Sequence, residues 1–245
     1  MALSGKAFVQ ELQEMVRRKH SKDHPVIGMI ERGELDRGQL KGFVGQFYLF
    51  FPKPFPKPIA AMLGRCPDDP VLEKMWIENV VEEGTGEITG TDSHKRLYIR
   101  FAEACGYTKE ELDGIEPLPE TEAFLDWREL LTHQRSWLEL YAGQGFCLEG
   151  TASERMTRVV NGLTKHYGFR RDSEEIRYWT LHMSVDEEHM RVGPYAVEKY
   201  ALTDFQQGQV RRAVQKTLDI FWLAYDGIQR AFVNRDPLYA KWRNP

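Results

Sequence analysis

Residues 203–232 read TDFQQGQVRRAVQKTLDIFWLAYDGIQRAF, and this stretch carries the clearest structural pattern in the chain. Its apolar residues recur at intervals of three and four, which is the spacing of one face of an α-helix. Thr203 and Asp204 precede the pattern, and short polar residues of this kind cap helix N-termini. The stretch therefore predicts a long amphipathic helix that opens at these two residues.

The same periodicity extends along nearly the whole chain, and no segment shows the alternation of a half-buried strand. Further helices are predicted over residues 7–18, 35–51, 70–83, 92–106, 121–146, 153–168 and 173–202. Between the second and third of these, FPKPFPKP at 51–58 is expected to form a rigid elbow, because proline cannot donate a backbone hydrogen bond and restricts the residue before it. We therefore predict an all-α fold, with residues 1–245 forming a single helical-bundle domain.

Composition excludes several classes of function. The chain has 245 residues, of which 42% are hydrophobic, and 33 Lys and Arg against 37 Asp and Glu give a net charge of −4. A chain without a basic stripe is not expected to bind nucleic acid or a membrane surface. Cys66, Cys105 and Cys147 lie far apart, so neither a disulfide framework nor a thiolate zinc site is indicated, and a reducing cytoplasm is expected. The N-terminus lacks the apolar core of a signal peptide.

The stretch HMSVDEEH at 182–189 is the first candidate for chemistry. On a helix, residues spaced by four and seven return to nearly the same face, so His182, Asp186 and His189 would project from one stripe. Imidazole and carboxylate side chains on a shared face can bind a metal, although so short a pattern also arises by chance. Partners elsewhere in the chain must decide between these two interpretations.

Two other segments offer such partners. In IENVVEEGTGEITGTDSH, Glu82 and Glu83 end an apolar helix, two glycines follow, and His94 begins the next helix. An acid and an imidazole placed in this way can converge across the turn. Glu149 lies in an otherwise apolar run, where a carboxylate is costly to bury without a partner, and a metal would supply one. The alternative is that Glu149 reaches solvent.

These segments, taken in order, resemble the haem-oxygenase-like diiron oxidases, which are relatives of the TenA and PqqC proteins. The match comprises E-x-G-x-G followed by His, a Glu in an apolar helix, and HxxxDxxH near the C-terminus. HPVIGMIERGELDRGQLKGFVGQFYLFF at 24–51 also looks like the opening helices of that superfamily. The resemblance covers most of the chain and implies a haem-oxygenase-like helical bundle.

Carried over residue by residue, the resemblance implies a set of ligands for two Fe(II) ions per chain, with Mn as an alternative metal. The ligands are Glu82, His94, Glu149, His182, Asp186 and His189. Glu82 fits the E-x-G-x-G spacing better than Glu83, which remains the alternative because adjacent helical residues point about 100° apart. Imidazole and carboxylate are suitable ligands for ferrous iron.

The function that follows is an oxidase that activates O2 to oxidise a small organic molecule, by C–C cleavage or N-oxygenation, in natural-product or cofactor biosynthesis. We expect an amino-acid-derived or fatty-acid carboxylate as substrate, but the sequence does not identify the Lys or Arg that would anchor it. The resemblance also implies a homodimer and leaves room for an external electron donor.

Several other residues are interpreted more simply. Tyr178 precedes His182 by one helical turn and is either a neighbour of the metal ligands or a core residue. Phe47, Tyr48 and Tyr141 are chiefly core residues by their spacing, with the alternative that they line a substrate cavity. The remaining four histidines lie beside charged or turn residues, and we expect them at the surface; they are His20, His24, His133 and His166.

Three alternatives remain. The first is a metal-free, TenA-like hydrolase of an aminopyrimidine that uses Cys147 as its nucleophile, and the second is a PqqC-like oxidase that works without a cofactor. The third is a non-catalytic protein that shares the fold. Within the diiron reading, the self-sacrificing p-aminobenzoate synthases use a lysine between the counterparts of Glu149 and His182. Lys165 is the sole lysine in that interval here, and its spacing fits poorly.

Overall fold

The computed structural model describes residues 1–183 and 192–243. Within these residues the chain is helical throughout and contains no strand, which confirms the predicted fold class. The α-helices are α1 (Gly5–Arg18), α2 (Pro25–Arg32), α3 (Arg37–Phe50), α4 (Lys57–Leu63), α5 (Pro70–Thr85), α6 (His94–Ala104), α7 (Lys109–Asp113), α8 (Pro119–His133), α9 (Trp137–Ala142), α10 (Ala152–His166), α11 (Arg177–Met183), α12 (Val192–Tyr200), α13 (Asp204–Ile228) and α14 (Ala240–Arg243). Short helices of other types are η1 (Ser21–Asp23), η2 (Gly143–Glu149), η3 (Glu174–Ile176), η5 (Gln229–Val233) and η6 (Pro237–Tyr239).

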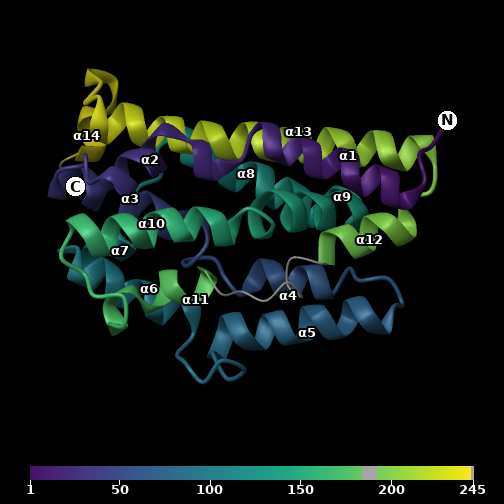
Figure 1. Cartoon of the computed structure of the whole chain (residues 1–245), viewed down its shortest axis with the longest axis horizontal. Helices are drawn as coiled ribbons and strands as arrows, with labels where there is room; N and C mark the ends of the chain where they lie inside the picture. Colours follow the sequence, from purple (N-terminus) through teal and green to yellow (C-terminus); the bar gives the residue numbers. More distant parts are fainter. Residues whose placement is uncertain (184–191, 244–245) are drawn as a thin grey trace.

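The helices form a layered bundle around one aromatic-rich core. In Figure 1, α1 and α13 run side by side along one long edge, α5 lies along the opposite edge, and α10 lies between them. α13 packs against α8 and α9, α10 against α2 and α11, and α6 against α5 and α11. The ends of α5 and α11 and the start of α6 therefore meet on one side of α10.

The long helix α13 follows the predicted pattern closely. Its apolar residues are buried along one face, including Val210, Val214, Phe221 and Tyr225. Thr203 is the N-cap, and its side chain accepts a hydrogen bond from the backbone N–H of Gln206 in a capping box. The predicted start of this helix is confirmed.

The proline-rich segment after α3 is the predicted elbow. α3 ends at Phe50, α4 begins at Lys57, and the residues between them form turns. Phe51 and Phe55 within the elbow are buried. The elbow therefore turns two aromatic rings into the interior, and both line the cavity described below.

The single helix predicted over residues 121–146 is wrong. The structure divides it into α8, which ends at His133, and α9, which starts at Trp137. Ser136 caps α9 through a hydrogen bond with the N–H of Glu139, whose side chain returns a bond to the cap. This capping box satisfies the free N–H groups of a new helix, so local polar chemistry prevails over continuous apolar periodicity.

Two of the four histidines predicted at the surface are in fact buried. His20 and His24 are 5% and 0% exposed, whereas His133 and His166 are exposed as expected. Both buried rings cap short helices, because their Nδ1 atoms accept backbone N–H groups of Lys22 and Val26. No helix among the described residues is long and apolar enough to cross a membrane.

Candidate metal centre

The first half of the site is formed where α5 ends and α6 begins. Glu82 and Glu83 occupy the last turn of α5, and His94 is the first residue of α6. The connecting loop is tight, because Gly86 adopts a left-handed conformation (φ 70°) and a Cβ there would lie 2.4 Å from the carbonyl oxygen of Asp92. Glycine therefore lets the chain reverse within a few residues and bring His94 back against the two glutamates.

His94 presents one ring nitrogen to each glutamate. Its Nε2 lies 3.2 Å from Oε1 of Glu82, and its Nδ1 lies 2.9 Å from Oε2 of Glu83. The contact with Glu82 has hydrogen-bond geometry, whereas Nδ1 is enclosed and makes no aligned hydrogen bond. Glu82 therefore forms a hydrogen bond with the ring of His94, whereas Glu83 lies close to Nδ1 without hydrogen-bond alignment.

Glu82 is tied to the loop that follows it. It accepts hydrogen bonds from the backbone N–H groups of Ile88 and Thr89 at 3.1 Å each, and from Oγ1 of Thr89 at 2.5 Å. Burial raises the pKa of Glu82, but the bonds from Thr89 and His94 outweigh it and hold the pKa below its ordinary value. Glu82 is thus an ionised, fully engaged carboxylate.

The second half of the site comes from α11. The Nδ1 atom of His182 lies 2.7 Å from the carbonyl oxygen of Tyr178, one turn earlier. As the donor in this bond, Nδ1 carries the proton and leaves the Nε2 lone pair free, and no described residue makes a hydrogen bond to Nε2. The rings of His182 and His94 meet edge to face, with centroids 4.7 Å apart.

Ligand atoms from these elements converge on one point. One ligand atom each from Glu83, His94 and His182 lie within 4.8 Å of one another, and the two histidines are buried. Glu83 and not Glu82 belongs to this group. The sequence pattern favoured Glu82, and the difference arises because the hydrogen bonds of the loop turn Glu82 toward Thr89.

Glu149 reaches the same region from a π-helical turn. η2 ends at Glu149, and its extra residue per turn is typical of functional sites in helical proteins. The turn packs closely on α12, because a Cβ on Gly145 would lie 2.6 Å from the Cα of Gly193. Gln144 donates a hydrogen bond of 2.8 Å to Oε1 of Glu149.

The electrostatics of these groups are strongly perturbed. Burial and, to a lesser extent, the neighbouring charge of Glu83 raise the pKa of Glu149 to about 7. Burial lowers the pKa of His94, but Glu83 and Glu82 overcome this and raise it to about 9. Burial and the positive charge of His94 lower the pKa of His182 to about 4. The pKa values of these neighbouring groups are therefore shifted in opposite directions, which is common at functional sites.

A small cavity joins these groups. Its free space of about 20 Å³ has room for roughly one water molecule. Three of its wall residues are the ionisable groups Glu83, Glu149 and His182, and Arg155 on α10 is a fourth. The remaining wall is mostly apolar: Phe51, Pro52, Phe55, Leu148, Ala152, Met156 and Tyr178. Sequence reasoning missed Arg155, although its helical position places it on the buried face with Ala152 and Met156.

Other predicted site residues lie elsewhere. Asp186 and His189 fall outside the described residues. Phe47 and Tyr48 pack in the core on Tyr98, and the hydroxyl of Tyr141 donates to the carbonyl oxygen of Met62. None of these three lines the cavity among the described residues. Tyr178 does line it, and its ring lies 4.4 Å from that of His182.

Two of the alternative hypotheses depend on Cys147 and Lys165, and neither side chain lies in surroundings that would make it reactive. Cys147 is fully buried, its thiol donates to the carbonyl oxygen of Val214, and burial raises its pKa well above the ordinary value. Lys165 is exposed on α10.

Known proteins with similar sequences are biosynthetic enzymes. The chain is 29% identical over 203 residues to a 4-aminobenzoate synthase of Chlamydia muridarum, which covers 80% of each chain. It is 28% identical over 196 residues to a 4-chloro-allylglycine synthase of Streptantibioticus cattleyicolor, covering 76% of this chain and 70% of the relative.

Solved structures agree on the fold. A TenA homologue from Pseudomonas syringae superposes with a TM-score of 0.77 at 16% identity, covering 91% of this chain and 93% of that one. A domain with a heme oxygenase-like fold from Shewanella denitrificans gives a TM-score of 0.68 at 13% identity, covering 98% and 96%. The haem-oxygenase-like fold expected from the sequence is therefore confirmed.

The family model described as iron-containing redox enzyme matches residues 41–222, which span α3 to α13 and include every element of the site. This match covers well over half of the chain. The protein therefore belongs to the iron-containing redox enzyme family, within the superfamily that the sequence resembled.

Proposed function

We propose that the protein is an O2-dependent non-haem diiron oxidase that converts a small organic carboxylate in a biosynthetic route. The observation that carries this proposal is the convergence of Glu83, His94 and His182 on one point, with Glu149 in the same cavity. Membership of an iron-containing redox family supports the metal, and the names of the relatives support a biosynthetic role.

The donor set fits iron. Imidazole nitrogens and carboxylate oxygens are the ligands of non-haem ferrous sites. Metal–ligand bonds of about 2.1 Å place adjacent ligand atoms about 3 Å apart. The separation of 2.9 Å between Nδ1 of His94 and Oε2 of Glu83, without hydrogen-bond alignment, suits two ligands of one ion.

We therefore assign Glu83, His94, Glu149 and His182 as iron ligands, with Asp186 and His189 completing a set for two ions. Manganese is an alternative metal at the same donors. In this assignment Glu83 takes the role that the sequence pattern gave to Glu82. His94 and His182 then each use one nitrogen for the metal and the other for a fixed hydrogen-bond partner, which is the usual arrangement of metal-bound imidazoles.

The protein's own groups orient and shield the centre. Glu82 holds Nε2 of His94, and the carbonyl oxygen of Tyr178 holds Nδ1 of His182, so both rings are fixed before metal binds. Phe51, Phe55 and Met156 give the cavity an apolar wall. Bound iron would supply the redox chemistry with O2 that no amino-acid side chain provides.

The hydrolase alternative has less support. A nucleophilic cysteine needs a lowered pKa or an adjacent base, and burial raises the pKa of Cys147 instead. Its thiol already donates to the carbonyl oxygen of Val214. Alkylation of the protein should therefore leave its activity unaffected until the fold itself opens.

The test is anaerobic loading with Fe(II), followed by measurement of iron per chain and of absorbance after mixing with O2. We expect up to two tightly bound irons and a transient visible absorption in the wild type. His182→Ala and Glu149→Ala should lose both, whereas His166→Ala, which changes an exposed histidine, should keep both. Absence of iron binding, or binding indifferent to the first two substitutions, would overturn the proposal.

A further inference from the structure

Arg155 is a buried cation that forms no ion pair with any described residue. Its side chain is on α10 and is 1% exposed, so it lies as deep as the core aromatic residues. No carboxylate of the described residues forms an ion pair with it, although other arginines of the chain have such partners, as Arg158 does. A buried guanidinium is unfavourable without a nearby anion, so Arg155 is suited to bind one.

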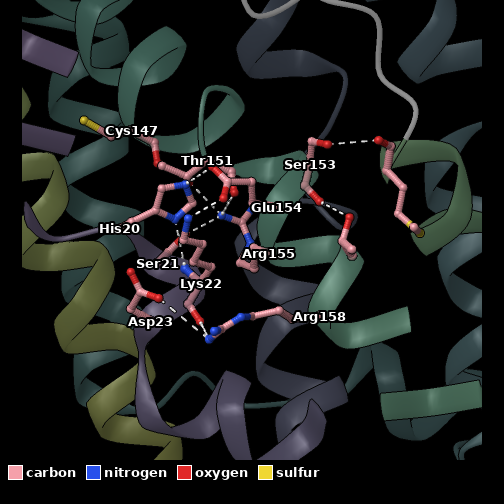
Figure 2. Close-up of polar contacts among 12 residues, drawn as sticks. His20, Ser21, Lys22, Asp23, Cys147, Thr151, Ser153, Glu154, Arg155 and Arg158 are labelled. Carbon is pink, nitrogen blue, oxygen red and sulfur yellow. Dashed lines mark hydrogen bonds and ion pairs between the residues drawn. The ribbon is translucent and has the colours of Figure 1, made fainter. Parts of the chain in front are cut away.

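The hydrogen bonds of Arg155 occupy one end of the guanidinium. As Figure 2 shows, it extends from α10 toward η1, and Nη1 donates to Oγ of Ser21 at 2.7 Å and to Oγ1 of Thr151 at 2.8 Å. Its Nε is enclosed and makes no hydrogen bond. The neutral hydroxyls therefore fix the orientation of the side chain without neutralising its charge.

The cavity beside Arg155 is the one lined by the candidate iron ligands Glu83, Glu149 and His182. Glu149 lines this cavity and interacts electrostatically with Arg155, yet it accepts its hydrogen bond from Gln144 and does not form an ion pair with Arg155. When Glu149 ligates a metal, its charge is balanced there, and Arg155 still requires an anion.

We propose that Arg155 binds the carboxylate of the substrate and thereby places the atoms next to that carboxylate at the metal centre. This inference rests on the proposed function. A guanidinium presents paired N–H donors that match a carboxylate, and burial strengthens the interaction. The cavity has room for about one water molecule, so a substrate enters only when the apolar wall yields. The position oxidised then lies within a few bonds of the carboxylate, and the rest of the substrate contacts Phe51, Phe55 and Met156. Met156 is the wall residue whose flexible side chain yields most readily to a ligand.

The first experiment titrates cobalt-loaded protein with hexanoate and with neutral hexanamide, following the visible absorption of bound Co(II). Hexanoate should cause a saturable change, and hexanamide should bind at least tenfold more weakly. Arg155→Met should weaken hexanoate binding at least tenfold with the cobalt content unchanged. The matched control is Arg158→Met, one turn along the same helix and half-buried, which should bind hexanoate as the wild type does.

A second pair of variants retains Arg155 and its contacts with Ser21 and Thr151. Ala152 lines the cavity and lies three residues before Arg155, so Ala152→Asp would bring a carboxylate to the guanidinium from within the chain. We expect this variant to bind hexanoate at least tenfold more weakly than Ala152→Asn, which adds the same bulk without the charge. These variants test the anion site even if Arg155→Met fails to fold.

Calorimetry of hexanoate binding to the metal-free protein separates this inference from the proposed function. Failure of the wild type to load metal would overturn the diiron proposal, while Arg155-dependent binding of hexanoate would still support the anion site. Equal affinity for hexanoate and hexanamide, equal affinity in the wild type and Arg155→Met, or no binding of hexanoate to either form of the wild type would overturn the role of Arg155.

Discussion

The molecule buries two pairs of histidines, and they differ in what their ring nitrogens contact. His20 and His24 flank η1, whereas His94 and His182 face each other between α6 and α11. All four side chains are at most 7% exposed. Burial alone therefore does not separate a structural histidine from a metal ligand.

In the first pair each ring is fully occupied. Nδ1 of His24 accepts the N–H of Val26, and its Nε2 lies 3.0 Å from Oδ1 of Asp226. Nδ1 of His20 accepts the N–H of Lys22, and its Nε2 lies 3.3 Å from Oε1 of Glu154. Because each histidine has its own cap and its own carboxylate, this pair fixes η1 and leaves no lone pair for a metal.

In the second pair the contacts converge instead. Nδ1 of His94, a carboxylate oxygen of Glu83 and a ring nitrogen of His182 share one point. The pKa of His94 is raised to about 9 while that of His182 is lowered to about 4, so neighbouring rings differ by several units. The comparison teaches that convergence of ligand atoms, together with opposed pKa shifts, distinguishes the candidate metal-binding pair.

The largest difference in metal affinity should appear when one histidine of each pair is replaced by alanine. We expect His182→Ala to lower the affinity for Fe(II) more than about 100-fold, because it removes a ligand rather than an outer partner. His20→Ala should leave that affinity within about threefold of the wild type. Its Nδ1 accepts the N–H of Lys22 and its Nε2 contacts Glu154, so neither nitrogen is available to a metal. Iron content after anaerobic desalting checks both, and similar losses in the two variants would erase the distinction between the pairs.

The two adjacent glutamates provide the next comparison. Glu83→Gln should resemble the loss of a ligand, whereas Glu82→Gln should lower metal affinity about 10–100-fold, the usual cost of losing an outer-shell partner of a metal-bound histidine. Competition with a chelator of known affinity measures both values. A larger loss for Glu82→Gln than for Glu83→Gln would restore Glu82 as the ligand.

Metal affinity should depend on pH through His94. In the metal-free protein the pKa of His94 is about 9, above the ordinary 6.5, so the fold stabilises the protonated ring. This stabilisation is fully present below pH 6.5 and is lost as the pH rises through 9. Metal requires the neutral ring, and binding therefore releases a proton in this window. The affinity for Fe(II) should rise about tenfold per pH unit from pH 7 to 9. Anaerobic titrations at three pH values would detect this, and a constant affinity would contradict it.

The smallest effect concerns stability. His24→Ala should lower the free energy of unfolding by about 2 kcal/mol, because it leaves a cavity beside Trp222 and removes the bond to Asp226. For a chain of this size the loss corresponds to a decrease in Tm of about 4–8 °C. In the metal-free protein His182→Ala should cost less, since it also relieves the repulsion from His94. Calorimetry of both variants without metal measures the two losses of stability. A larger loss for His182→Ala than for His24→Ala would mean that His182 is the structural residue.

The local sequence was sufficient to predict a helix boundary where a capping residue or prolines lay at that boundary. Thr203 and the elbow at 51–58 have the predicted effects, because capping and proline geometry act within a few residues. Apolar periodicity was insufficient over residues 121–146, where the capping box at Ser136 starts a new helix within an uninterrupted pattern.

For the candidate site, sequence reasoning found the segments but not every contact. It placed His94 and His182 in one site, and the structure brings their rings together. It favoured Glu82 over Glu83, because motif spacing carries no information on the loop hydrogen bonds that turn Glu82 toward Thr89. It also placed His20 and His24 at the surface, because their carboxylate partners Glu154 and Asp226 are more than 130 residues away in the chain.

The sequence by itself therefore determined the helical class and the helix boundaries marked by capping residues or prolines, since these depend on neighbours within one or two turns. Only the tertiary structure decided that Glu83 groups with both His94 and His182, and which buried imidazoles are fully occupied. It alone placed Arg155 beside the cavity without an ion pair to any described residue. The physical reason is that burial and pairing depend on residues brought together from distant parts of the chain, and a local pattern contains no record of them.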